Sequence, residues 1–169
     1  MKSFLITCAV LVGLGTAAEA SSYWQINASS CVQDASTIQA GLALNVNGHV
    51  TFASGKYGDL VLYCPIPYNL GFSPTLMSFV YTTNANTVTD YIEMQYVKMN
   101  LTNTSNLGNI GTDAVVYNTT TTATPVWSYN QSITTTYIPA SYAYWVRIDM
   151  VRSSPTSSVP AVYAVRVSN

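Results

Sequence analysis

The sequence predicts an all-β protein, an antiparallel β-sandwich of about eight or nine strands with jelly-roll character that follows a cleaved leader. Three observations predict it. Apolar and polar residues alternate with a period of two along most of the chain, β-branched and aromatic residues are abundant, and segments rich in Asn, Thr, Gly and Ser separate the alternating runs. No window shows a convincing helical period, and this combination is typical of a sandwich.

The first twenty residues have the layout of a secretory signal peptide. Met1-Lys2 is basic, Phe4–Leu14 is an apolar run, and Ala18-Glu19-Ala20 has the small-x-small pattern of a cleavage site. The apolar run is shorter than the about 20 residues that a membrane-spanning helix needs. We therefore expect residues 1–20 to be removed, residues 21–169 to form one domain, and the protein to be extracellular or periplasmic without stable membrane insertion.

The charge of the chain excludes two classes of partner. Charged residues make up 8% of the sequence and the net charge is −1. Nucleic-acid binding depends on neutralising a phosphate backbone, and anionic membranes attract polybasic segments. Neither is expected here.

Two cysteines remain after the leader, which contains Cys8. Cys31 and Cys64 form an even pair, and in an oxidising compartment such a pair predicts one disulfide. Two buried free thiols are the alternative. A zinc site would need more ligands than these two cysteines and the single histidine, His49, readily supply.

The first strands are predicted around a hairpin. Alternating apolar residues predict a strand over 38–46, Asn47-Gly48 is a two-residue turn signal, and a return strand follows over 50–53. In the strand predicted over 60–66, Pro65 lacks an amide donor, so the strand should end there or lie at an edge. Further strands are predicted over 76–82, 91–99, 114–118, 126–134, 142–152 and 159–167, with loops over 83–90, 101–112, 119–125 and 153–158.

Short motifs resemble those of a group of small secreted bacterial proteins of unknown function. They are the early Cys31-Val-Gln-Asp34, the run Leu62-Tyr-Cys-Pro-Ile66, the late Tyr144-Trp-Val-Arg-Ile-Asp-Met150, and the closing Val162–Val167. The resemblance implies a bacterial β-sandwich with a Cys31–Cys64 bridge, and it implies no reaction. Five N-x-S/T triplets would be glycosylation acceptors in a eukaryotic host, but chance in a chain rich in Asn, Ser and Thr accounts for them: Asn27, Asn100, Asn103, Asn118 and Asn130.

Catalytic groups are scarce. His49 follows a hairpin turn, no G-x-S-x-G motif accompanies it, and we expect it to be a solvated turn residue. Glu93 and Asp149 could converge as the acid pair of a glycosidase if their strands are neighbours, but Arg147 would then also be close. An ordinary cross-strand ion pair on a solvated face is the favoured outcome, so we expect a protein that is not an enzyme.

No cofactor is expected. Calcium bound by loop oxygens near Asp59, Asp90 and Asp113 is the alternative that stays open. No acidic cluster accompanies these residues, and a turn-capping role is favoured for each.

The aromatic residues give the strongest indication of a binding surface. Tyr and Trp number 13 and 3 against 4 Phe, which suggests rings that also meet water. The alternative, which carries more weight, is that the strands of a sandwich simply favour Tyr. Along 142–152 the even residues Tyr144, Val146, Ile148 and Met150 are predicted to be core. By the same parity argument, Trp127, Tyr129 and Ile133 should face the core, opposite Ser128, Asn130 and Ser132.

Alternation leaves one aromatic strip facing outward. It consists of Trp145, Arg147 and Asp149 and, if 91–99 is the neighbouring strand, Tyr91, Glu93 and Gln95. A second layer or the loop 101–112 could instead cover Trp145 and make it core. The sequence thus predicts a secreted, non-catalytic module that binds an extracellular carbohydrate or another surface protein. The alternatives are a self-associating surface protein, and a glycoside-active enzyme that uses Glu93 and Asp149.

Overall fold

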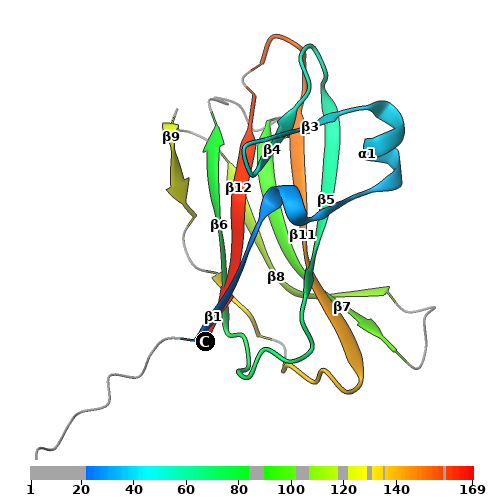
Figure 1. Ribbon diagram of the computed structural model, residues 1–169, viewed down its shortest axis with the longest axis vertical. Coiled ribbons are helices and arrows are strands. Elements are labelled where there is room, and N and C mark those ends of the chain that lie inside the picture. The colour runs from blue at the N-terminus through cyan, green and yellow to red at the C-terminus, as the bar shows by residue number, and fades with distance from the viewer. Residues whose placement is uncertain are drawn as a thin grey trace, which may run out of the picture.

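The computed structural model describes residues 22–83, 90–101, 107–117, 122–128, 131–134, 136–157 and 159–169, and these form two antiparallel sheets (Figure 1). Sheet A holds β3 (Ala43–Val46), β4 (His49–Phe52), β12 (Ala161–Ser168), β6 (Leu76–Thr83), β10 (Gln131–Ser132), β1 (Tyr23–Asn27) and β9 (Thr122–Trp127). Sheet B holds β2 (Val32–Gln33), β5 (Gly58–Ile66), β11 (Tyr142–Arg152), β7 (Tyr91–Asn100) and β8 (Leu107–Tyr117). The predicted all-β sandwich is confirmed, while the predicted leader 1–20 lies outside the described residues.

The strand order is that of a jelly roll. Sheet A runs β10-β6-β12-β4-β3, with β1 also paired to β12 and β9 to β6, and sheet B runs β2-β5-β11-β7-β8. Consecutive strands β4 and β5 lie in different sheets, beside β12 and β11, which also follow one another. The β4–β5 connection and the β11–β12 connection therefore both cross from one sheet to the other, and their strands pair with each other in both sheets, as in a jelly roll.

The core lies between the two sheets and is built by alternation. Tyr144 is 3% exposed and Val146, Ile148 and Met150 are 0% exposed, so the predicted inward face of β11 is confirmed. Sheet A contributes Phe79, Val165 and Val167 to the same core from β6 and β12. Because these side chains point inward, the odd residues of β11 lie on the outer face of sheet B.

A disulfide ties the N-terminal segment to sheet B. Cys31 and Cys64 are bonded, as predicted, and both belong to the hydrophobic core. Cys31 follows the short 3-10 turn η1 (Ala28–Ser30), which leads from β1 in sheet A to β2 in sheet B. The bond therefore fixes the point at which the chain crosses between the sheets.

The prediction of one strand over 38–46 is wrong in its first half. Residues Ala35–Ala40 form the helix α1, and only Ala43–Val46 is a strand. Asp34 caps the helix by accepting a hydrogen bond from the Ser36 amide, and Gly41, at φ 58°, ends it in the left-handed conformation. Ile38, which the strand pattern placed on one face with the other apolar residues of 38–46, is 61% exposed. The hairpin turn at Asn47-Gly48 is confirmed, since both residues have positive φ.

Several other predicted strands and strand limits differ from the structure. The sequence missed β1 and β2, and β8 begins at Leu107, inside the predicted loop 101–112. The segment predicted as one strand over 126–134 contains the end of β9 and the separate strand β10, and residues 122–125 of the predicted loop 119–125 belong to β9.

The predicted facing of the segment after Val126 is reversed at its start. Trp127 is 43% exposed and Ser128 is 8% exposed. Ser128 is drawn inward because its amide donates to the Phe79 carbonyl and its hydroxyl accepts from the Phe79 amide. Ile133 is buried, as predicted.

Candidate functional site

The predicted outward strip assembles on the outer face of sheet B. β11 and β7 are antiparallel neighbours, with Trp145 opposite Val97, Arg147 opposite Gln95, and Asp149 opposite Glu93. Tyr91 lies one pair further along, opposite Val151. The condition on which the strip depended, that 91–99 is the neighbouring strand, is met, and we call these six residues the Trp145 strip (Trp145, Arg147, Asp149, Tyr91, Glu93 and Gln95).

The charged end of the strip is internally satisfied. Arg147 Nη2 lies 3.1 Å from Asp149 Oδ2, and Arg147 Nε donates to Asp149 Oδ1 at 3.2 Å. Gln95 Nε2 donates to Glu93 Oε1 at 2.7 Å. The expectation of a cross-strand ion pair on a solvated face is wrong on both counts, because the pair lies within β11 and Asp149 is only 9% exposed.

Burial changes the ionisation of Asp149. Desolvation raises the pKa of its carboxyl above the ordinary 3.8, Arg147 opposes that rise, and Glu93 adds to it. Val61, the residue opposite Asp149 on β5, is 9% exposed. Glu93 and Asp149 are therefore adjacent, but the Asp149 carboxylate is paired with Arg147 and lies beside the apolar Val61.

The helix α1 covers the free edge of β5 at this end. The Thr37 hydroxyl accepts from the Val61 amide at 2.9 Å, and the Asp34 amide donates to the Val61 carbonyl at 3.0 Å. Thr37 is 0% exposed. Hydrogen bonds from Ser36 lower the pKa of Asp34, and the Arg147 charge lowers it further.

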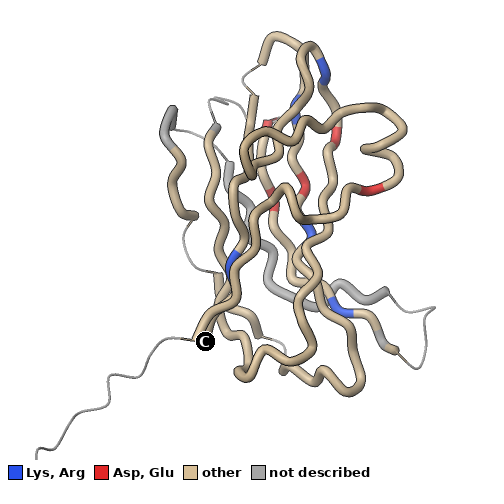
Figure 2. Tube along the Cα trace, viewed as in Figure 1, with Lys and Arg blue, Asp and Glu red and all other residues tan. Residues whose placement is uncertain are grey.

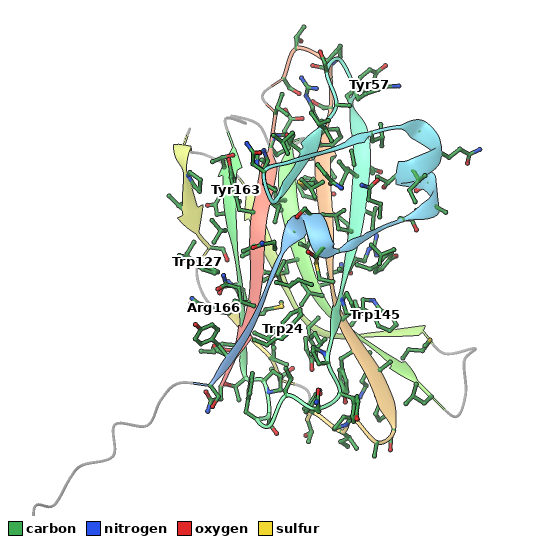
Figure 3. All side chains as sticks on the ribbon, viewed as in Figure 1. Trp24, Tyr57, Trp127, Trp145, Tyr163 and Arg166 are labelled. Atoms are coloured by element: carbon green, nitrogen blue, oxygen red, sulfur yellow. A yellow bond between two sulfur atoms is a disulfide. The ribbon has the colours of Figure 1, made fainter. Side chains whose placement is uncertain are left out.

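Trp145 lies at the other end of the strip. It is half-buried, and its ring meets the ring of Tyr63 edge to face with centroids 6.5 Å apart. The indole Nε1 is buried and has no hydrogen-bond partner among the described residues. Trp145 is thus neither fully buried nor fully exposed on the outer face of sheet B. Figure 3 shows it on the sheet B side of the sandwich.

A cleft of about 610 Å³ opens beside Trp145, and we call it the end cleft. Its lining is mostly apolar and consists of Pro65, Ile66, Pro67, Tyr68, Leu101, Pro139, Tyr142, Ala143, Tyr144 and Trp145. Tyr68 is 77% exposed and Leu101 is 51% exposed. This exposed aromatic and proline surface is the feature of the described residues that most resembles a ligand site.

Local sequence chemistry explains why the cleft forms here. Pro65 and Pro67 cannot donate amide hydrogen bonds, so β5 ends and β2 pairs with it only at Leu62 and Tyr63. The predicted effect of Pro65 is confirmed. The chain then continues through the exposed Tyr68, and Pro65, Pro67 and Tyr68 line the end cleft beside Trp145.

Hydrogen bonds from two tyrosines fix the walls of the end cleft. The Tyr137 hydroxyl donates to the Pro67 carbonyl at 2.7 Å, so the segment after β5 is tied to the segment before β11. Tyr144 accepts from the Ile138 amide at 2.8 Å and donates to the Thr136 carbonyl at 3.3 Å. Burial raises the pKa of Tyr144, which keeps this hydroxyl protonated. The cleft is therefore held in shape without a ligand.

One cation borders the end cleft. Lys98 Nζ lies 4.4 Å from the centre of the Tyr142 ring, a cation–π contact. Lys98 faces Tyr144 in the strand pairing and so stands at the same end of β7 and β11. A polar group at the rim of an apolar site is the arrangement that orients a bound molecule.

The remaining candidates for chemistry are dispersed. His49 is the first residue of β4 and stacks on Tyr163 with centroids 4.7 Å apart, so the expectation of a solvated turn residue is wrong. Asp59 is exposed in β5, Asp90 is 2% exposed and accepts from the Ser153 amide, and Asp113 lies in β8. Within the described part of the chain, no three His, Cys, Asp or Glu side chains gather as metal ligands.

The sequence predicted Trp145 as a binding residue but did not predict the end cleft beside it. Tyr68, Leu101 and Tyr142 were not assigned to a site. The available signal was the run Pro65-Ile-Pro-Tyr68, in which two prolines end a strand and an aromatic residue follows at once. Its contact with the segment before β11 could not be read from the sequence.

No protein-family model matches the chain, and no curated protein matches it. Among solved structures it is similar to a family two carbohydrate esterase from Cellvibrio japonicus, with a TM-score of 0.45 and 12% identity over 88% of this chain. The chain spans 34% of the length of that protein. No helix in the described residues is long and apolar enough to cross a membrane.

Proposed function

We propose that the protein is a secreted, non-catalytic module that binds an extracellular carbohydrate polymer in the end cleft. The single observation that supports this most is the open cleft of about 610 Å³ with Trp145 and the exposed Tyr68 in its lining. Its size is within the range of small-molecule sites. Its shape is fixed by hydrogen bonds that need no ligand.

The chemistry of the lining favours a sugar ring over a charged or wholly apolar ligand. Trp and Tyr present flat apolar faces that pack against the C–H faces of a sugar and polar edges that meet water. Lys98 and the hydroxyls of Tyr68 and Tyr142 supply donors for sugar oxygens. Few charges take part, so we expect binding to depend weakly on salt.

The placement of the carboxylates supports a binding rather than a catalytic role. A glycosidase needs two carboxylates that flank the scissile bond across a cleft. Glu93 and Asp149 lie side by side on one sheet face, Asp149 is paired with Arg147, and neither lines the end cleft. Glu93→Gln should therefore leave binding in the end cleft unchanged.

Secretion is the other part of the proposal. The Cys31–Cys64 disulfide is a bond that persists in oxidising compartments, and the N-terminal sequence has the layout of a cleaved leader. N-terminal sequencing of protein recovered from the medium or periplasm tests it. An N-terminus at or near Ser21 supports it, and an intact Met1 in a cell-retained protein overturns it.

The binding proposal is tested first with a panel of neutral polysaccharides by affinity electrophoresis and calorimetry. Tyr68→Ala should weaken the strongest interaction by about fivefold to thirtyfold, since exposed aromatic contacts of this kind contribute roughly 1–2 kcal/mol. Tyr57→Ala is the matched control, because Tyr57 is 54% exposed and lies at the other end of the molecule (Figure 3). Equal losses in both variants would overturn the assignment of the cleft.

Self-association is the second candidate, and the edge of sheet A supports it. β3 ends the sheet on one side, and Leu44 in β3 is 46% exposed. An edge strand without charges is open to pairing with another copy. Light scattering separates the two functions, because a monodisperse monomer at high concentration would contradict assembly and leave the binding proposal intact.

A further inference from the structure

We propose that the outer face of sheet A holds a second binding site, for the carboxylate of an acidic polysaccharide, centred on Arg166. This site lies on the opposite sheet from the end cleft and stands or falls independently of it. Its three central residues are Tyr23, Arg166 and Trp127, which we call the Arg166 stack.

Two exposed rings flank the arginine. The guanidinium carbon of Arg166 lies 4.0 Å from the centre of the Trp127 ring and 6.0 Å from that of Tyr23. Trp127 is 43% exposed and Tyr23 is 60% exposed. Strand pairing brings them together from three separated segments, because β1 and β6 both pair with β12 and β9 pairs with β6. Figure 3 shows Arg166 and Trp127 on the side of the sandwich away from Trp145.

Arg166 has no acidic partner. Among the described residues the one ion pair is Arg147–Asp149, and the contacts that Arg166 makes are with the two rings. All the acidic residues after the leader lie in strands of sheet B or in the segments that flank them, namely Asp34, Asp59, Asp90, Glu93, Asp113 and Asp149. Figure 2 shows the acidic positions gathered on the α1 and sheet B side. Arg166 is therefore a cation on sheet A with no acidic side chain paired to it among the described residues.

The flanking rings fix the guanidinium. Ser78, directly opposite Arg166 on β6, is 2% exposed, so this part of the face is covered, while Gln25, opposite on β1, is exposed. A guanidinium stacked on a ring keeps its N–H groups at the edge, where they can donate two parallel hydrogen bonds to a carboxylate. The arginine is thus oriented before any ligand arrives.

Arg166 and the two flanking rings together favour one class of ligand. A carboxylate alone would be satisfied by any acidic peptide, but the rings on both sides of Arg166 offer flat apolar surfaces of the size of a sugar ring. A chain of uronic acid units provides both features, since each unit carries a carboxylate beside a C–H face. Gln25 can hydrogen-bond to the hydroxyl groups at the rim.

The test compares polygalacturonate with the same polymer after methyl esterification, which keeps the ring and removes the charge. Calorimetry with the mature protein should give binding to the acid form that is about tenfold or more tighter than to the ester. Arg166→Gln should remove that preference, and Tyr23→Ala should weaken binding to the acid form. Lys56→Gln and Tyr57→Ala are the matched controls and should leave binding to the acid form unchanged.

Several results would overturn the proposal. They are equal binding of acid and ester, failure of polygalacturonate, alginate and hyaluronate alike to bind, wild-type binding by Arg166→Gln, and an equal loss in Lys56→Gln. Binding of polyglutamate as tight as that of polygalacturonate would assign the face to acidic peptides instead. Tyr23 is exposed on an edge strand, so Tyr23→Ala keeps the test decisive if Arg166→Gln does not fold.

Discussion

Arg147 and Asp149 form a two-point ion pair along a single strand, with Nη2–Oδ2 and Nε–Oδ1 distances of 3.1 and 3.2 Å. Residues two apart in a strand share a face, so the pair needs no neighbouring strand to form. It pairs the two charges that β11 contributes to the Trp145 strip. Trp145, at the other end of these β11 residues, also lines the end cleft and is the residue of the strip that can contact a ligand there.

The pH dependence of stability should reflect the burial of Asp149. Burial raises its folded pKa above the ordinary 3.8, so the ionised carboxylate costs stability at neutral pH. That cost disappears as the pH falls through the raised pKa towards the ordinary value. We expect the stability of the wild type relative to Asp149→Asn to rise between about pH 7 and about pH 4 in urea unfolding. A wild-type advantage that shrinks as the pH falls would contradict this.

The disulfide should account for much of the stability. It closes a loop with a sequence separation of 33 residues, for which the chain-entropy model gives about 3–4 kcal/mol. The double variant Cys31→Ala, Cys64→Ala should lose about this free energy of unfolding, measured in urea without reductant. Reduction of the wild type should produce the same loss, and a loss below about 1 kcal/mol in both would be the contrary result.

Substitution of Arg152 should lower the stability of the protein more than substitution of any other Lys or Arg. It is 4% exposed and donates to the carbonyls of Lys56, Pro155 and Ser157. Arg152→Met leaves these carbonyls without their donor and should cost about 2–4 kcal/mol. Arg166→Met, which removes a half-buried arginine with ring contacts only, should cost no more than about 1 kcal/mol. Thermal unfolding of both variants checks the ranking, and equal costs would refute it.

The affinity of the end cleft for its ligand should fall when the hydrogen bond between Tyr137 and Pro67 is removed. Tyr137→Phe removes the hydroxyl that donates to the Pro67 carbonyl at 2.7 Å and changes no residue that lines the end cleft. We expect a loss of about threefold to tenfold in affinity for the bound polysaccharide with little change in enthalpy per mole of sites, because preorganisation is reduced. Calorimetry measures it, and an unchanged affinity would show that the wall is fixed by other contacts.

Local signals predicted the sandwich well where one face is buried. The inward set on β11 and the turn at Asn47-Gly48 follow from alternation and from the φ values that the turn needs. The same reasoning misread 35–40, because Ile38 and Ala40 fit a strand pattern while Asp34 and Gly41 supply helix caps. The cap residues were visible in the sequence, but a six-residue helix has too few turns to show a helical period.

The candidate site could be predicted only in part because it depends on contacts between distant segments. Parity placed Trp145 outward, and pairing with β7 added Glu93 and Gln95 as expected. The end cleft also requires the bond from Tyr137 to Pro67, across a sequence separation of 70. Trp127 was placed inward because one strand was assumed to continue through Ser128, whose bonds to Phe79 turn that residue to the inside.

The central claim, binding of a polysaccharide at Trp145, is tested most directly by calorimetry on a matched set of variants. Trp145→Phe keeps an aromatic face and removes the buried Nε1–H that has no partner among the described residues, so it should bind within about threefold of the wild type. Trp145→Ala removes the face and should weaken binding roughly thirtyfold, a loss of about 2 kcal/mol, while Tyr57→Ala should bind as the wild type does. Wild-type affinity in Trp145→Ala would contradict the account.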